Sequence, residues 1–326
     1  MIPLLAILLS LYGALGASPA KALTPPEKAF FTKSVLRSSW DLMPDRSIPQ
    51  PRVHQRTSSD RDIFTLTFSD PLTGTFKLRL DGPLNFMHSR SGPSPLALIS
   101  AGFFTGAAVL DLFGRSKDTE NLILAAIEYM PDPEKALERP EEAVQTLVQV
   151  PGRLYVALQW LRRQTWVSEK NIHVIAISLG SLYMPLTLNL LEEENWRPRT
   201  LTFAFGGARI QEPLTEILKP YLGEKGSQDL MTLALPLLEP YDPQLYLPAL
   251  KGPKLVIHGT RDEVFLPASQ RALDESLQEP VVTRFVKGLH IDPSRPSEIE
   301  QTLDILSEWI FQSKLLRTLD EGALSK

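Results

Sequence analysis

The pattern that most restricts the fold of this 326-residue chain is a series of short, mainly apolar runs separated by helical patterns. Runs of this kind are typical of β-strands that helices cover on both faces. They span residues 96–99, 122–127, 172–177, 201–205, 255–257 and 281–286. Because strands here alternate with helices, the pattern predicts an α/β fold with one mainly parallel sheet sandwiched between helices.

Other segments add to this alternation. Residues 64–68 and 76–80 alternate apolar with polar side chains on either side of a Pro- and Gly-containing turn, which predicts an N-terminal antiparallel hairpin. Apolar stripes at helical spacing predict helices over 152–163 and 297–312. Residues 208–239 form a short helical insertion, interpreted either as a lid over a site or as packing on the sheet edge.

The N-terminal segment has the features of an export signal. Residues 2–20 carry no charged side chain, and Ala20-Lys21-Ala22 is typical of a cleavage site. A signal peptide over 1–22 predicts a periplasmic or secreted protein. Since no Lys or Arg precedes the apolar stretch, an uncleaved N-terminal anchor stays the alternative. No other segment has the ~20 apolar residues of a membrane span, so we expect none in the mature chain.

The rest of the chain divides into two parts. Residues 23–58 are polar and rich in proline, and we interpret them as an N-terminal arm. Residues 59–326 form the expected α/β domain.

Composition narrows the available chemistry. The chain has no cysteine, which excludes disulfides, thiolate metal sites and a cysteine nucleophile. It has 34 Lys and Arg against 38 Asp and Glu, so no basic excess favours nucleic acid as a partner. Catalysis would therefore depend on hydroxyl, imidazole and carboxylate groups.

A serine lies where the predicted strand 172–177 turns into a helical segment. Ser178 has the small residues Ala176 and Gly180 two positions away on each side. A sharp strand-to-helix turn forces a serine into a strained backbone conformation, and only small neighbours permit such a close approach. Pro185 lies inside the predicted helix, where a proline is unfavourable.

A carboxylate and an imidazole follow two later strands. Asp262 comes after the run 255–257, and His290 comes after the run 281–286. Glu263 is the neighbouring alternative to Asp262, and Asp262 could also simply cap the next helix. The carboxyl ends of parallel strands share one edge of the sheet, so the order Ser178, Asp262, His290 predicts that the three side chains meet there.

These segments resemble the α/β-hydrolase superfamily over residues 60–312. The resemblance depends on AISLG around Ser178, HGTRDEVFLP around Asp262 and GLH at His290, in the family's order. It implies an α/β-hydrolase fold with Ser178 as the nucleophile, His290 as the general base and Asp262 as the residue that orients the imidazole. It also implies that no metal and no organic cofactor are needed.

The resemblance further implies an oxyanion hole made of two backbone N–H groups. One would belong to Leu179, the residue after the nucleophile, and the other to Phe103, with Phe104 as the alternative. Phe103 lies in the loop after the run 96–99, where Ala-Gly-Phe replaces the family's usual His-Gly-x.

Three functions follow as hypotheses. The first is a serine hydrolase that cleaves small-molecule carboxylic esters through an acyl-enzyme on Ser178. The second is a serine peptidase that acts on short peptides with the same triad. The third is an exported binding protein that has the fold without turnover, and the complete set of Ser178, Asp262 and His290 argues against it.

Overall fold

The computed structural model describes residues 47–57, 60–88, 92–101, 106–114, 119–128, 140–192, 195–292 and 294–310. The expected signal peptide at 1–22 and the arm up to residue 46 lie outside these ranges, as does the loop 102–105. In the described part of the chain, no helix has the combination of length and apolar character that a membrane crossing requires.

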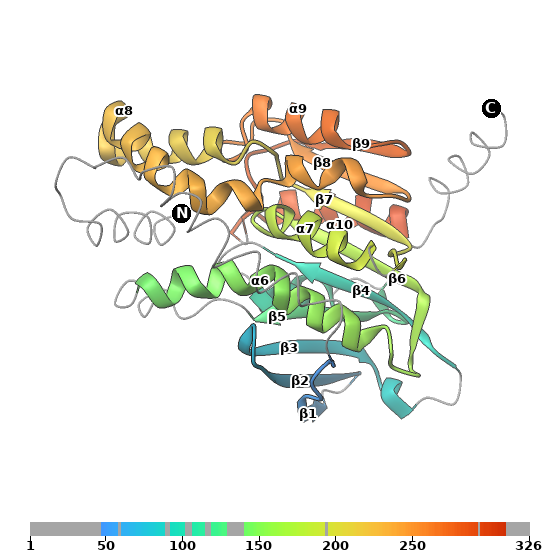
Figure 1. Cartoon of the computed structure of the whole chain (residues 1–326). Helices are drawn as coiled ribbons and strands as arrows, with labels where there is room; N and C mark the ends of the chain where they lie inside the picture. The colour runs from blue at the N-terminus through green and yellow to red at the C-terminus, as the bar shows by residue number, and fades with distance from the viewer. Residues whose placement is uncertain are drawn as a thin grey trace.

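Within the described residues, nine strands form one sheet in the order β1-β2-β3-β5-β4-β6-β7-β8-β9 (Figure 1). The strands are β1 Arg52–Thr57, β2 Arg61–Asp70, β3 Gly74–Pro83, β4 Ser94–Ser100, β5 Ile123–Glu128, β6 Val167–Ile177, β7 Thr200–Ala204, β8 Lys254–Gly259 and β9 Val281–Val286. The pairs β1–β2, β2–β3 and β3–β5 are antiparallel. The remaining pairs, from β5–β4 across the sheet to β8–β9, are parallel. The predicted hairpin (β2 and β3) and the mainly parallel sheet are both confirmed.

Helices cover both faces of the sheet. They are α4 Val109–Phe113, α6 Pro140–Leu161, α7 Gly180–Glu192, α8 Gln211–Leu238, α9 Pro267–Ser276 and α10 Pro296–Ile310. Short 3-10 turns are η2 Phe86–His88, η3 Gly106–Ala108, η5 Glu239–Tyr241, η6 Pro243–Leu245 and η7 Leu247–Ala249.

The two faces have separate apolar cores. Leu96 and Leu98 of β4 join a cluster with α6, α7 and α9, whereas Ala97 and Ile99 join a second cluster with α4 and α10. Figure 1 shows α6 and α7 in front of the sheet and α10 behind it. Because alternate side chains of one strand enter different cores, a central strand must be apolar throughout. This explains the unbroken runs of the sequence.

The two edge strands differ from the sequence-based expectation. Residues 52–57 were expected in an irregular arm, but they form β1 and pair antiparallel with β2. The five whose burial the structure describes, residues 52–56, are all exposed, so burial leaves no apolar pattern in them. At the other edge, β9 was expected to be covered on both faces, yet Phe285 is 64% exposed. An edge strand has a neighbouring strand on one side only, so its side chains are less buried than those of the central strands.

The predicted helical insertion is α8. It consists of two helical arms separated at Gly223, whose φ of 69° and ψ of 175° break the helix. Figure 1 shows both arms extending past the sheet beside α9.

In α7, the helix continues through Pro185, which is buried. A proline removes one intrahelical hydrogen bond, and α7 tolerates this loss.

Candidate active site

Ser178 lies in a strained turn between β6 and α7. Its φ is 54°, in the left-handed region that residues with a side chain rarely adopt. The turn is held by hydrogen bonds on both sides of the serine. The Ser178 N–H donates to Ala204 O at 2.9 Å, and the Ser178 carbonyl accepts from the Ser181 hydroxyl at 2.6 Å. A conformation this unfavourable persists only where the surroundings fix it, and such places are commonly functional.

The small residues beside Ser178 have a steric cause. A Cβ atom on Gly180 would lie 2.0 Å from the carbonyl oxygen of Ser100, at the end of β4. Ala176 is the β6 partner of the same Ser100 and is fully buried. The backbone of β4 therefore passes directly under the turn, and a larger residue at position 180 would push the turn away from it.

The three residues predicted from sequence meet in one hydrogen-bonded row. Ser178 Oγ lies 2.7 Å from His290 Nε2, and His290 Nδ1 lies 2.9 Å from Asp262 Oδ2. The Asp262 side chain is fully buried and the His290 side chain is 12% exposed. Each imidazole nitrogen thus has one partner, and the ring lies between a hydroxyl and a carboxylate.

The carboxylate of Asp262 is held on its other oxygen as well. Oδ1 accepts hydrogen bonds from the backbone N–H groups of Val264 and Phe265, both at 2.8 Å. These bonds fix the plane of the carboxylate, so that Oδ2 stays directed at His290.

Two aromatic rings contact the imidazole. Phe205 packs edge-on against His290 at a centroid distance of 5.9 Å, and Phe265 lies at the same distance with a tilt of 42°. Both phenylalanines are buried. The ring is therefore confined by apolar groups while its two nitrogens remain hydrogen-bonded.

The loops that carry the acid and the base are bound to each other. The Arg261 N–H donates to Gly288 O at 2.9 Å, and the Thr260 N–H donates to Val286 O at 3.0 Å. A Cβ atom on Gly259 would lie 2.8 Å from the carbonyl oxygen of Leu289, so the loops touch through their backbones. This close approach explains the glycine in the sequence HGTRD.

Glu263 does not contact the imidazole. Its carboxylate accepts the backbone N–H of His290 at 2.8 Å, so the alternative that it replaces Asp262 as the partner of the ring is wrong. Sequence reasoning also missed Arg295, which donates to the His290 carbonyl at 2.9 Å. Neither contact follows from a sequence spacing, because the residues lie on different loops.

The predicted oxyanion donors are described only in part. Leu179 follows Ser178 in the turn before α7 and is half-buried. Phe103 and its alternative Phe104 belong to the loop 102–105, which lies outside the described residues. In the described part of the chain, no cluster of three or more His, Asp or Glu side chains is placed to hold a metal ion.

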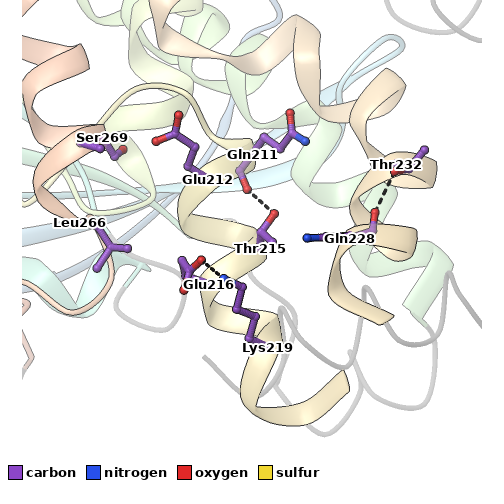
Figure 2. A pocket seen from close by; sticks show the side chains of 10 residues that line it. Gln211, Glu212, Thr215, Glu216, Lys219, Gln228, Thr232, Leu266 and Ser269 are labelled. Carbon is purple, nitrogen blue, oxygen red and sulfur yellow. Dashed lines mark hydrogen bonds and ion pairs between the residues drawn. The ribbon is translucent and has the colours of Figure 1, made fainter. Parts of the chain in front are cut away.

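A pocket of about 570 Å³ lies between the two arms of α8 and the start of α9 (Figure 2). Its walls are Gln211, Glu212, Thr215, Glu216, Lys219, Gln228, Thr232, Leu266, Ala268 and Ser269. Glu216 and Lys219 form an ion pair at its rim, which raises the pKa of the Lys219 ammonium above its usual value through the hydrogen bond to Glu216. The wall 266–269 begins four residues after Asp262.

The fold is shared with known hydrolases. An acetyl xylan esterase from Paenibacillus sp. R4 superposes with a TM-score of 0.60 at 13% identity, over 90% of this chain and 99% of that chain. Acetyl xylan esterase 1 from Thermoanaerobacterium sp. JW/SL YS485 superposes with a TM-score of 0.58 at 10% identity, over 90% and 98%. The chain has the α/β-hydrolase fold.

A peptidase has the same fold over part of its length. The puromycin-hydrolyzing peptidase of Mycobacterium tuberculosis superposes with a TM-score of 0.57 at 14% identity, over 81% of this chain and 40% of that chain. No protein-family model matches the sequence, and no curated protein matches it. The resemblance inferred from the motifs is thus confirmed at the level of the α/β-hydrolase fold.

Proposed function

We propose that this α/β-hydrolase-fold protein is a serine hydrolase that cleaves carboxylic esters through an acyl-enzyme on Ser178. The observation that carries the proposal is the continuous row of hydrogen bonds from Ser178 Oγ through His290 to the buried carboxylate of Asp262. A serine hydroxyl is a weak nucleophile unless a base accepts its proton, and this row supplies such a base.

The proposed mechanism assigns one role to each side chain. Ser178 Oγ attacks the ester carbonyl while His290 Nε2 accepts its proton, and His290 then delivers that proton to the leaving alcohol. Asp262 holds the imidazole in the tautomer with hydrogen on Nδ1 and stabilises the imidazolium ion. Water then attacks the acyl-enzyme with His290 as the base, which restores the Ser178 hydroxyl and releases the carboxylic acid.

The negative charge that develops on the carbonyl oxygen needs donors that are already in place. The N–H of Leu179 is proposed as one donor, because this residue follows Ser178 directly, in the turn before α7. The N–H of Phe103, in the loop after β4, is proposed as the second. The contact between Ser100 and Gly180 supports this pairing, because it holds the end of β4 against the turn that carries Ser178.

The share of each known protein's length that this chain spans favours an ester over a peptide as substrate. The chain spans 99% and 98% of the two acetyl xylan esterases, but only 40%, 42% and 41% of three peptidases with the same fold. The esterases therefore match this chain in size as well as in fold. Hydrolysis of short peptides by the same triad is the second candidate function.

Two further assignments from the sequence are kept as proposals. Export, by a signal peptide over residues 1–22, would place the hydrolysis of small esters in the periplasm or outside the cell. A lid role for 208–239 is supported by the pocket, whose walls come from α8 and from the segment that follows the Asp262 loop.

The test is covalent labelling followed by turnover. A serine-reactive fluorophosphonate probe should label the wild-type protein and leave Ser178→Ala unlabelled. An unlabelled wild type would contradict the hydrolase and favour the binding protein. Nitrophenyl acetate and aminoacyl anilides then distinguish an esterase from a peptidase. We expect turnover of the ester, and turnover of the anilides alone would make the peptidase the better assignment.

A further inference from the structure

Two charged side chains hold the backbone of His290 from opposite sides. The His290 N–H donates to Glu263 Oε2 at 2.8 Å, and the His290 carbonyl accepts from Arg295 Nη1 at 2.9 Å. The same Arg295 nitrogen lies 3.5 Å from Glu263 Oε1, so the two side chains also form an ion pair with each other. Both polar groups of the His290 backbone are therefore bonded to one ion pair.

The local sequence directs both side chains to this position. Glu263 follows Asp262, so one short segment provides the partner of the imidazole ring and the partner of the His290 backbone. Arg295 ends a tight turn in which its N–H donates to Asp292 O at 2.9 Å and the Ser294 N–H donates to Asp292 Oδ1 at 2.8 Å. The helix α10 begins at the next residue and fixes the end of that turn.

His290 needs such support because it lies in a loop between β9 and α10. Loops move more than the strands and helices that they connect. Asp262 and Ser178 each bond one nitrogen of the ring, and two phenylalanines confine it. None of these contacts holds the His290 backbone that carries the ring. A displacement of about 1 Å at a catalytic group can cost on the order of 100-fold in rate, so the position of this backbone bears directly on the proposed proton transfer.

Stability does not explain this pair of charges. The Glu263 side chain is 43% exposed and the Arg295 side chain is 32% exposed. Ion pairs with this much contact with water contribute little to folding. Both side chains instead have their short contacts with the one residue that the proposed mechanism uses as the base.

We propose that Glu263 and Arg295 are positioning residues, which set the place of the His290 imidazole by holding its backbone N–H and carbonyl. The inference rests on the proposed function, in which His290 takes the proton of Ser178. Neither residue contacts Ser178 Oγ or the imidazole nitrogens through the hydrogen bonds described above, so both act through His290 alone.

The experiment compares variants that remove a contact with variants that conserve it. Glu263→Ala and Arg295→Ala remove one contact each. Glu263→Gln conserves an oxygen that can accept the His290 N–H, and Arg295→Lys conserves a cationic donor. Glu300→Ala and Arg271→Ala are matched controls, because both residues are exposed charges outside the site.

Turnover of nitrophenyl acetate is the first measurement. We expect Glu263→Ala and Arg295→Ala to lower kcat about 10- to 100-fold with little change in KM, while the thermal midpoint stays near that of the wild type. Glu263→Gln should recover most of the lost kcat, and the two controls should behave as the wild type.

The second measurement does not depend on turnover. The proton between His290 Nδ1 and Asp262 should give a downfield proton NMR signal in the wild type, and this signal should broaden or vanish in Glu263→Ala. The inference is overturned if kcat and the signal are unchanged in both alanine variants, or if Glu263→Gln loses as much kcat as Glu263→Ala. A wild type that fails to label with fluorophosphonate would overturn the proposed function instead, and the NMR comparison would still test the positioning.

Discussion

The carbonyl oxygen of Ser100 lies 2.0 Å from the place where a Cβ atom on residue 180 would stand, and glycine is the residue found there. The end of β4 and the first turn of α7 consequently touch backbone to backbone. Since Ser178 precedes this contact by two residues, the contact sets the distance between the serine and the end of β4.

Gly180→Ala tests this contact. The added methyl group has no room beside Ser100, so either β4 or the turn must move. We expect a loss of about 1–3 kcal/mol in the free energy of unfolding, together with a lower rate of fluorophosphonate labelling at Ser178. Urea unfolding and labelling kinetics measure the two effects. A variant with wild-type values in both would show that the backbone beside Ser100 has room for a Cβ atom on residue 180.

Asp262→Asn tests the acid of the row. The amide still provides an oxygen for the N–H groups of Val264 and Phe265, but its nitrogen cannot accept the Nδ1 proton of His290. The wrong tautomer would then be favoured, and we expect kcat on nitrophenyl acetate to fall by about 10⁴-fold.

The chain offers a matched control in its second histidine–carboxylate pair. His258 Nε2 lies 3.1 Å from both carboxylate oxygens of Asp274, and that pair has no part in the proposed mechanism. Asp274→Asn should leave kcat unchanged. Equal losses in the two variants would mean that Asp262 has no special role.

His173 makes the stability of the protein depend on pH. Burial, with a smaller effect of Arg199, lowers the pKa of His173 from 6.5 to about 4. As pH falls through 6.5, the unfolded chain takes up a proton at this residue and the folded protein does not. His173 therefore costs no stability above pH 6.5, and its effect lowers the free energy of unfolding by about 3 kcal/mol as the pH falls to 4.

His173→Asn should reduce this pH dependence. Asparagine can still bond the Thr200 hydroxyl, which lies 2.8 Å from His173 Nδ1, but it does not titrate. The quantity to compare is the change in unfolding free energy between pH 7 and pH 4.5, measured in urea for both proteins. An equally steep decline in the variant would assign the pH dependence to other groups.

Two buried hydroxyls lack a hydrogen bond within the described structure. They are Ser100 Oγ, at the end of β4, and Thr202 Oγ1, in β7. Because an unpaired buried polar group costs about 1–3 kcal/mol, Ser100→Ala and Thr202→Val should each stabilise the protein by about 1 kcal/mol. Thermal unfolding measures this gain, and a lower midpoint in both variants would show that the hydroxyls have partners in solution.

Turnover of nitrophenyl acetate distinguishes the roles of the two hydroxyls. Thr202 is a core residue between β6 and β8, so its variant should keep wild-type turnover. Ser100 adjoins Gly180 and the loop after β4. A loss of turnover in Ser100→Ala alone would indicate that its hydroxyl faces the reacting group.

The residues of the hydrogen-bonded row could be predicted because each follows a recognisable strand. Ser178, Asp262 and His290 come after the runs 172–177, 255–257 and 281–286, and parallel strands bring their carboxyl ends to one edge. The apolar runs could be found because the two cores bury both faces of the central strands. Local sequence was sufficient in these cases.

Other features have no local signal. Residues 52–56 of β1 are exposed, so nothing in their pattern distinguishes a strand from an irregular arm. Glu263 and Arg295 meet at His290 although 32 positions separate them in the chain, and exposed charges occur throughout a sequence of this composition. Contacts of this kind depend on how loops fold over one another, which periodicity does not report.

The position of β9 at the edge of the sheet has a consequence for how the protein loses activity. Ser178 follows β6, which has paired strands on both sides, whereas His290 follows β9, which within the described residues pairs with β8 alone. Local opening starts where few hydrogen bonds and little burial hold the chain. Amide hydrogens of β9 should therefore exchange with solvent faster than those of β6. Heat should separate the base from the nucleophile before the molecule melts, and turnover should fail at a lower temperature than the fold.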